Sequence, residues 1–243
     1  MAARVIMVTS GKGGTGKSTL SVLLGGALAA QKKNVLLVEL DAGLRSVDLI
    51  AGVSSQTVFD LGDILSGNCK PDKALTDSPI YPGLHVLCAP YSAATVNGRV
   101  FVSFIHALRN VVDFIILDTA AGLGDAFKAA SACLTAQDMA LLVLTPDIIS
   151  ARDGRIAVNA LPAVQPPEIR IVFNKVTDKP GAGLAALDDA IDMVGAQLLG
   201  VVPYSEEVLF AADGKALTSG TAKTAIHNIA RRLGGEYVPL AVR

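Results

Sequence analysis

Short runs of hydrophobic residues recur along the chain and alternate with stretches of helical periodicity. Most of these runs are continuous, as expected for strands that are buried on both faces of a parallel sheet. Between them, apolar residues repeat with helical spacing, as in Leu20–Leu28 and Ile226–Leu233. We predict strands at Arg4–Thr9, Val35–Leu40, Leu84–Ala89, Phe114–Leu117, Ala140–Thr145, Ile169–Phe173 and Gly200–Val202.

This alternation predicts an α/β fold of three layers, in which a mostly parallel sheet of about seven strands carries helices on both faces. The 243 residues suffice for one large core, and no linker or low-complexity segment divides them. We therefore predict a single domain over residues 1–243. The least regular stretch, Ser54–Pro82, is predicted to form short helices and loops.

Composition narrows the class of protein. Hydrophobic residues make up 51% of the chain and charged residues 18%, which is typical of a globular protein. A net charge of -1 provides no basic field for nucleic acid. Cys69, Cys88 and Cys133 form no CxxC pair, so we interpret them as buried hydrophobes in a reducing compartment. No leader-like segment or membrane-spanning run is evident, and we expect a cytoplasmic protein.

A glycine-rich segment, Gly11–Ser18, matches the phosphate-loop pattern GxxxxGK[ST] between a predicted strand and a predicted helix. Glycines let backbone N–H groups surround phosphate oxygens, and the positive end of the helix faces the same anion. In this pattern Lys17 bridges the β- and γ-phosphates and Ser18 binds Mg²⁺. The sequence therefore predicts ATP and Mg²⁺ as cofactors, with contacts from Gly11, Lys12, Gly13, Gly14, Thr15, Gly16, Lys17, Ser18 and Thr19.

A turn without a ligand is the alternative to a phosphate loop at Gly11–Ser18, and it is disfavoured because Lys12 and Lys17 would repel each other with no anion between them.

Two carboxylates follow predicted strands, where ligands of open α/β sheets bind. Asp118 ends the run Phe114–Leu117, as in a Walker B strand, and Asp41 follows Val35–Leu40. We predict that Ser18, Asp41 and Asp118 hold the metal.

The segment GKGGTGKST, with its additional Lys12, resembles the deviant phosphate loop of the MinD/ParA family of dimerising ATPases. Asp41–Gly52 is similar to the DxGLRNLDLxxG segment of the septum-site-determining MinD branch of that family. Asp118–Leu123 and Thr145–Asp153 resemble two further segments of the branch, D[ST]PAGL and TPExSSxRD. The resemblance extends from Arg4 to about Leu233.

The resemblance implies roles for individual residues. Lys12 reaches across a dimer interface to the partner's nucleotide, and Asp41 positions the attacking water and the magnesium ion. Asn174 matches the asparagine that reads the edge of adenine, and Pro203 matches a proline beside the base. Glu39 stands where the family has aspartate, and we predict that this carboxylate, together with Lys12, Lys17, Asp41 and Asp118, contributes to a slow hydrolysis.

The chain departs from this branch at its end. MinD proteins end in a basic amphipathic helix that inserts at the membrane surface. Here Gly234–Arg243 contain two glycines, Pro239 and one basic residue, Arg243. We therefore expect no direct membrane binding, and at most a peripheral location through a partner.

The expected function is an ATPase, converting ATP and water to ADP and phosphate, that dimerises with ATP and positions a septum-site or other cargo complex with a protein activator. One alternative is a nucleotide-dependent binding module that does not hydrolyse ATP. Another is a ParA-like partitioning ATPase on DNA, which ranks lower because Lys and Arg are dispersed. A small-molecule kinase would leave Lys12 unexplained, and an iron–sulfur carrier would need paired cysteines.

Overall fold

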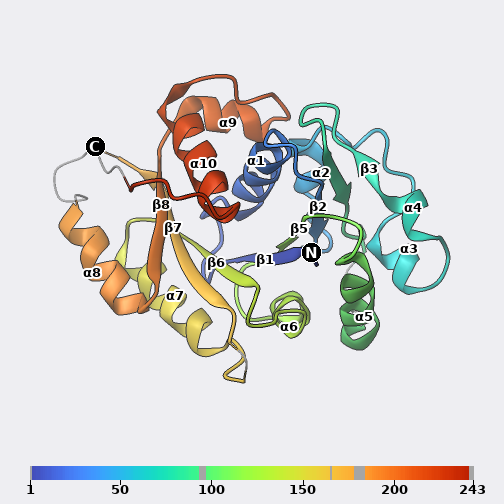
Figure 1. Ribbon diagram of the computed structural model, residues 1–243, viewed down its shortest axis with the longest axis horizontal. Helices are drawn as coiled ribbons and strands as arrows, with labels where there is room; N and C mark the ends of the chain where they lie inside the picture. The colour runs from blue at the N-terminus through green and yellow to red at the C-terminus, as the bar shows by residue number, and fades with distance from the viewer. Residues whose placement is uncertain (1, 93–96, 165, 178–183, 241–243) are drawn as a thin grey trace.

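The strands form one sheet in which all neighbouring pairs are parallel except the first. The computed structural model describes residues 2–92, 97–164, 166–177 and 184–240. Within them the sheet has eight strands in the order β3-β4-β2-β5-β1-β6-β7-β8, and only β3 and β4 pair antiparallel (Figure 1). The strands are β1 (Arg4–Thr9), β2 (Val35–Glu39), β3 (Thr76–Asp77), β4 (Leu84–Leu87), β5 (Phe114–Asp118), β6 (Met139–Leu144), β7 (Glu168–Val176) and β8 (Gln197–Pro203).

Helices cover both faces of this sheet. The core cluster on one face contains side chains of α1, α2, α9 and α10, and the cluster on the other contains side chains of α5, α6, α7 and α8 (Figure 1). The helices are α1 (Lys17–Ala29), α2 (Val47–Ile50), α3 (Leu61–Leu65), α4 (Pro71–Ala74), α5 (Gly98–Leu108), α6 (Asp125–Ala132), α7 (Ile148–Asn159), α8 (Leu184–Val194), α9 (Glu206–Ala212) and α10 (Gly220–Leu233).

The three-layer α/β prediction is confirmed, and each of the seven predicted strands is present. The sheet has one strand more than expected because β3 has only two residues, too few for a hydrophobic pattern. The stretch predicted to be irregular, Ser54–Pro82, contains α3, α4 and β3. No helix among the described residues is both long and apolar enough to span a bilayer.

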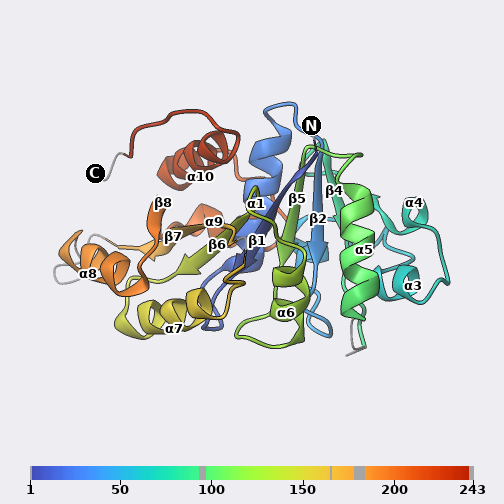
Figure 2. The same cartoon turned by 60° about the horizontal axis from the view of Figure 1, so that its bottom comes forward.

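Burial of the strands explains why their sequences are continuous. All residues of β2, β5 and β6 are buried, because helices cover these strands on both sides. Alternate residues therefore enter opposite cores: Val35 and Leu37 pack with α1, whereas Leu36 and Val38 pack on the α5 side. The central strands β2, β5 and β1 lie next to one another and run in the same direction (Figure 2).

Because these strands are parallel, their carboxyl ends meet at one edge of the sheet. The loop after β1 leads into α1, Glu39 ends β2, and Asp118 ends β5 directly beside Glu39 in the strand register. The phosphate-loop segment and the predicted acidic residues are thus brought to the same edge. This is the edge at which ligands of open α/β sheets bind.

Candidate functional site

The glycine-rich loop adopts a conformation that depends on two of its glycines. Gly14 and Gly16 have φ angles of 75° and 91°, in the left-handed region that side chains disfavour. A Cβ at Gly16 would also collide with the Nδ2 atom of Asn174. Gly16 is the N-cap of α1 and provides no side-chain hydrogen bond to the helix. The first-turn N–H groups therefore have no side-chain cap, as in helix ends that bind anions.

Lys17 and Asp118 form the buried centre of the site. Burial lowers the pKa of Lys17, while the charges of Asp118 and Asp41 act in the opposite direction. Asp118 is fully buried, and burial raises its pKa to about 6 although Ser18 and Ser21 act to lower it. Ser21 Oγ donates to Asp118 Oδ1 at 2.8 Å, whereas Oδ2 accepts no hydrogen bond from the described residues. A buried carboxylate oxygen without a donor suits a cation or metal-bound water.

The predicted metal residues Ser18, Asp41 and Asp118 lie close enough to act on one another. The Ser18 hydroxyl lowers the pKa of Asp118, and the charge of Asp41 raises it. No group of three or more His, Cys, Asp and Glu in the described ranges could hold a metal by itself. A metal here would need the hydroxyl of Ser18 and ligand oxygens in addition, and such a mixed oxygen set fits Mg²⁺ bound with a phosphate.

Glu39 is completely buried and lies under the segment that carries Asp41. Its Oε1 accepts a hydrogen bond from the Val47 N–H at 3.0 Å, and its Oε2 accepts one from the Ala89 N–H at 3.3 Å. Burial raises the pKa of Glu39 to about 7 in spite of these two bonds. Because both oxygens bind backbone, this placement favours a positioning role over the predicted direct role in hydrolysis.

A pocket of about 90 Å³ lies beside the start of α1 and brings together three predicted nucleotide contacts, two of them predicted to contact the base. Its walls include Thr19, Asn174 and Pro203, from three separate elements. Asn174 is nearly fully buried, and its Nδ2 donates to the Thr15 carbonyl at 2.8 Å. Gly16, another predicted nucleotide contact, also lines the pocket. The remaining lining residues were not predicted, because only the fold brings them here: Lys175, Tyr204, Ser205, Val208, Leu209 and Ala212.

Lys12 contacts the beginning of α7. Its Nζ lies 3.3 Å from Oδ2 of Asp147, and Asp147 is the N-cap of that helix. Thr145 Oγ1 donates to the same carboxylate oxygen at 2.6 Å. A Cβ at Gly11 would collide with Asp153, further along α7, so the loop and this helix are tightly packed. The Lys12 side chain remains 42% exposed to solvent.

Residues 6–217 match the family described as the CobQ/CobB/MinD/ParA nucleotide binding domain. The chain is 32% identical to the septum site-determining protein MinD of Synechocystis sp., over 97% of its own length and 91% of that protein. The chain belongs to the MinD/ParA family. The predicted resemblance to this family, and to MinD within it, is thereby confirmed.

Solved structures of MinD proteins have the same fold. The MinC:MinD cell division complex of Aquifex aeolicus contains a chain with a TM-score of 0.89 and 30% identity, with 99% of each chain covered. MinD of Pyrococcus horikoshii, solved with Mg-ADP, has a TM-score of 0.85 and 24% identity, covering 95% of this chain and 96% of that one. The fold is therefore the P-loop NTPase fold of the MinD/ParA type.

Two polar residues of this MinD-like site were given no role from the sequence. Ser21 lies one helical turn after Ser18, and that spacing on one helix face is the signal that could have identified it. Asp147 belongs to the predicted TPDIISARD segment, but its contact with Lys12 spans 135 residues. A local motif contains no information about such a contact.

Proposed function

We propose that this chain is a MinD-type ATPase that binds ATP with Mg²⁺, dimerises in the ATP-bound state and hydrolyses ATP slowly. The main support is that Lys17, Ser18 and Asp41 all act on the buried carboxyl group of Asp118, whose Oδ2 lacks a donor among the described residues. Membership of the MinD/ParA family supports the same assignment.

The position of each residue in the site determines its proposed role in binding and hydrolysis. Lys17 and the uncapped N-terminus of α1 would neutralise phosphate charge, and Ser18 with Asp118 would hold the metal. When bound, Mg²⁺ offsets the charge that develops on the transferred phosphoryl group. Asp41 is only partly buried and lies near both Lys17 and Asp118, where it orients the attacking water. The pocket beside Asn174 and Pro203 receives the base.

Phosphate release tests the hydrolysis directly. We expect the wild type to release phosphate from ATP in the presence of Mg²⁺, at a rate per protomer that rises with protein concentration. Asp41→Ala is expected to lower this rate at least about tenfold while ATP still binds. Binding and dimerisation without turnover at any concentration would instead identify a non-hydrolysing module.

The position of Lys12 supports a nucleotide-dependent dimer. In a single protomer its ammonium group is paired with Asp147 at the edge of the site and remains partly exposed, so it is available to a second copy. Size-exclusion chromatography with light scattering should show a dimer with ATP and a monomer with ADP. Lys12→Ala is expected to stay monomeric with ATP. A monomer of the wild type under all conditions contradicts this part of the proposal.

We further propose that the dimer positions a cell-division complex or another cargo through a protein activator. The relatives named septum site-determining proteins and the MinC:MinD complex of Aquifex aeolicus support a protein partner. Residues 234–240 contain no helix, and Arg232 holds them through the carbonyls of Val238 and Pro239. We propose that any membrane location is peripheral and comes through the protein partner. Lipid vesicles that sediment the ATP-bound protein at physiological salt would contradict this, and retention on DNA would favour the ParA-like alternative.

A further inference from the structure

The connections that follow β2 and β4 are joined by backbone hydrogen bonds. The Gly43 N–H donates to the Pro90 carbonyl at 3.0 Å. Glu39 binds an amide from each connection, Val47 on one side and Ala89 on the other. The segment that carries Asp41 is therefore bound directly to Pro90 at Gly43, and is linked at Val47 to Ala89 through the Glu39 carboxylate.

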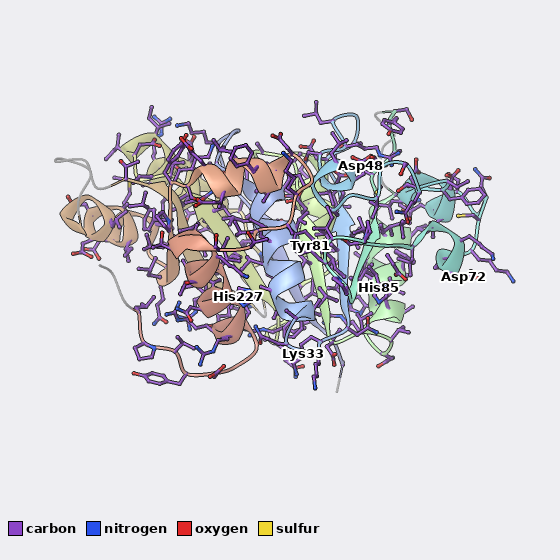
Figure 3. All side chains as sticks on the ribbon, turned by 90° about the horizontal axis from the view of Figure 1, so that it is seen from above. Lys33, Asp48, Asp72, Tyr81, His85 and His227 are labelled. Atoms are coloured by element: carbon purple, nitrogen blue, oxygen red, sulfur yellow. The ribbon has the colours of Figure 1, made fainter. Side chains whose placement is uncertain are left out.

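A cation–aromatic contact covers this junction on the outside. The guanidinium carbon of Arg45 lies 3.8 Å from the centre of the Tyr91 ring, and its Nε lies 3.2 Å from Asp48 Oδ2. Arg45 is 5% exposed, whereas Tyr91 is 67% exposed. Asp48 lies at the end of the molecule where α1 begins, and Lys33, which follows α1, lies at the opposite end (Figure 3). The contact is thus on the edge that carries the site.

Arg45 adopts an uncommon backbone conformation at this point. Its φ angle is 41°, in the left-handed region that disfavours a side chain of this size. Such strained residues persist where their surroundings fix them, and they cluster at functional segments. Here the ring of Tyr91 and the carboxylate of Asp48 hold the side chain.

Asp41 lies between two backbone positions, Leu40 and Gly43, that hydrogen bonds hold in place. On one side, the Leu40 N–H donates to the Asp118 carbonyl at 2.8 Å. On the other, Gly43 is bound to Pro90. The position of Asp41 relative to the phosphate loop therefore depends on how firmly residues 43–47 are held against the end of β4.

We propose that Tyr91, Arg45 and Glu39 form a clasp that positions Asp41 for hydrolysis. This inference rests on the proposed ATPase function and adds a residue, Tyr91, that lies outside the phosphate loop and is largely exposed. None of the three touches the phosphate-loop segment through a described hydrogen bond. Loosening the clasp therefore lowers kcat and leaves nucleotide affinity unchanged, because the loop and Lys17 keep their geometry.

Tyr91→Leu tests the clasp, because it removes the aromatic face and retains an apolar side chain. A small misplacement of a reacting group has large kinetic effects, and we expect kcat to fall about tenfold with KM for ATP within about twofold of wild type. Tyr91→Phe retains the ring and loses only the long 3.5 Å hydrogen bond from the Tyr91 hydroxyl to Asp48 Oδ2, so kcat should stay within about twofold of wild type. The matched control is Tyr237→Leu, which removes a tyrosine that is 89% exposed near the C-terminus.

Amide hydrogen exchange of the nucleotide-free protein provides a second readout that needs no turnover. Tyr91→Leu should exchange faster than wild type at Gly43 and Val47, and Tyr91→Phe should not. Unchanged exchange in Tyr91→Leu, an unchanged kcat, or a KM that rises in proportion to the loss of kcat would each overturn the proposal. A wild type that never hydrolyses ATP would overturn the proposed function instead, while the exchange rates would still decide whether the clasp holds residues 43–47.

Discussion

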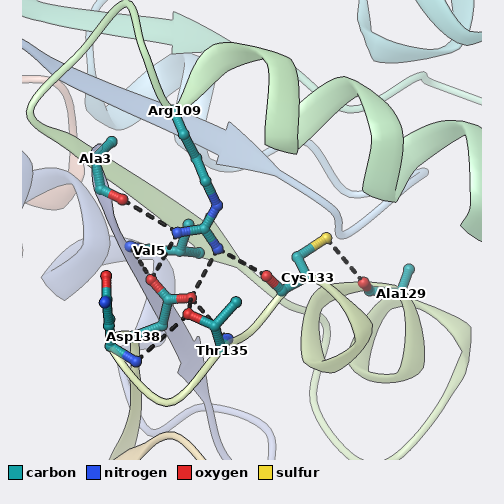
Figure 4. A network of polar contacts seen from close by, with 8 residues as sticks. Ala3, Val5, Arg109, Ala129, Cys133, Thr135 and Asp138 are labelled. Atoms are coloured by element: carbon teal, nitrogen blue, oxygen red, sulfur yellow. Dashed lines mark hydrogen bonds and ion pairs between the residues drawn. The ribbon is translucent and has the colours of Figure 1, made fainter. Parts of the chain in front are cut away.

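Two buried aspartates lie at opposite ends of the central strands, and their surroundings differ sharply. At the carboxyl end, Asp118 has one oxygen bonded to Ser21 and the other without a donor among the described residues. At the amino end, Asp138 accepts two bonds from Arg109 and further bonds from Val5 and Thr135 (Figure 4). Both side chains are completely buried.

The pKa values of the two groups follow from these surroundings. Burial raises the pKa of Asp118 to about 6, because its partners are too few to offset the loss of water. Burial also opposes ionisation of Asp138, but the bonds from Arg109, Val5 and Thr135 outweigh it and lower the pKa. A buried carboxylate with all its partners fixes the fold, whereas one that lacks partners at a ligand-binding edge is typical of a functional site.

The largest expected effect comes from removing the charge at the carboxyl end. Asp118→Asn keeps the shape of the side chain but loses the charge that holds the metal. We expect ATP hydrolysis to fall by a factor of about 100 or more, which corresponds to about 3 kcal/mol in the activation barrier. Phosphate release under saturating ATP and Mg²⁺ measures it, and a loss below about threefold would separate Asp118 from catalysis.

The same substitution at the amino end should act on stability instead. Asp138→Asn leaves Arg109 without its charged partner in a buried network, and breaking such a pair costs about 4 kcal/mol. Urea unfolding should show the loss, while turnover per folded molecule stays at the wild-type value. An Asp138→Asn variant as stable as the wild type would contradict the claim that Asp138 stabilises the fold whereas Asp118 serves the functional site.

The pH dependence of stability should separate the two aspartates further. With a folded pKa of about 6 against an ordinary 3.8, Asp118 stays protonated in the folded state while the unfolded chain already ionises. The contribution of protonated Asp118 to the free energy of unfolding is fully present below pH 3.8 and is lost as the pH rises through about 6. In the nucleotide-free protein, Asp118→Asn does not lose this stability as the pH rises, because asparagine does not ionise. The loss in the wild type corresponds to about 3 kcal/mol at most.

Urea unfolding at about pH 4 and about pH 7 measures this effect as the difference in free energy of unfolding between Asp118→Asn and wild type. The difference should move in favour of the variant between these two values. Asp138 has a lowered folded pKa, so its stabilisation is present above pH 3.8 and is lost only at lower pH. A difference that stays constant across this range would show that Asp118 ionises normally.

A smaller effect on stability tests the conformation of the phosphate loop at the carboxyl end of the strands. Gly16→Ala places a side chain at a φ of 91° and against Asn174, and we expect a loss of about 2 kcal/mol in unfolding free energy. A Cβ at Gly13 would meet no atom within 4 Å, so Gly13→Ala should change stability by less than about 0.5 kcal/mol. Equal losses in thermal unfolding would contradict the assigned loop geometry.

Local patterns were sufficient for the framework of this fold. Apolar runs identify the seven longer strands, and the runs of the central strands are continuous because helices bury them on both faces. The phosphate loop is recognisable because its glycines and lysines are adjacent in the sequence. Even Asp118 is accessible to this reasoning, since it directly follows a buried run.

The remaining features depend on residues that only the fold brings together. Glu39 binds Ala89, 50 positions away, and Arg45 lies under Tyr91. No periodicity relates these positions, and a lone carboxylate before Asp41 suggests chemistry more readily than a backbone contact. The partners of Asp138 are likewise dispersed, with Arg109 at the end of α5.

Calorimetric titration of ATP, with Mg²⁺ and with EDTA, into wild type, Asp118→Asn and Asp138→Asn tests the central claim most directly. We expect Mg²⁺ to increase the affinity of the wild type and of folded Asp138→Asn by the same factor, and to have little effect on Asp118→Asn. Equal Mg²⁺ dependence in all three proteins would contradict the assignment of the carboxyl edge as the Mg²⁺–ATP site.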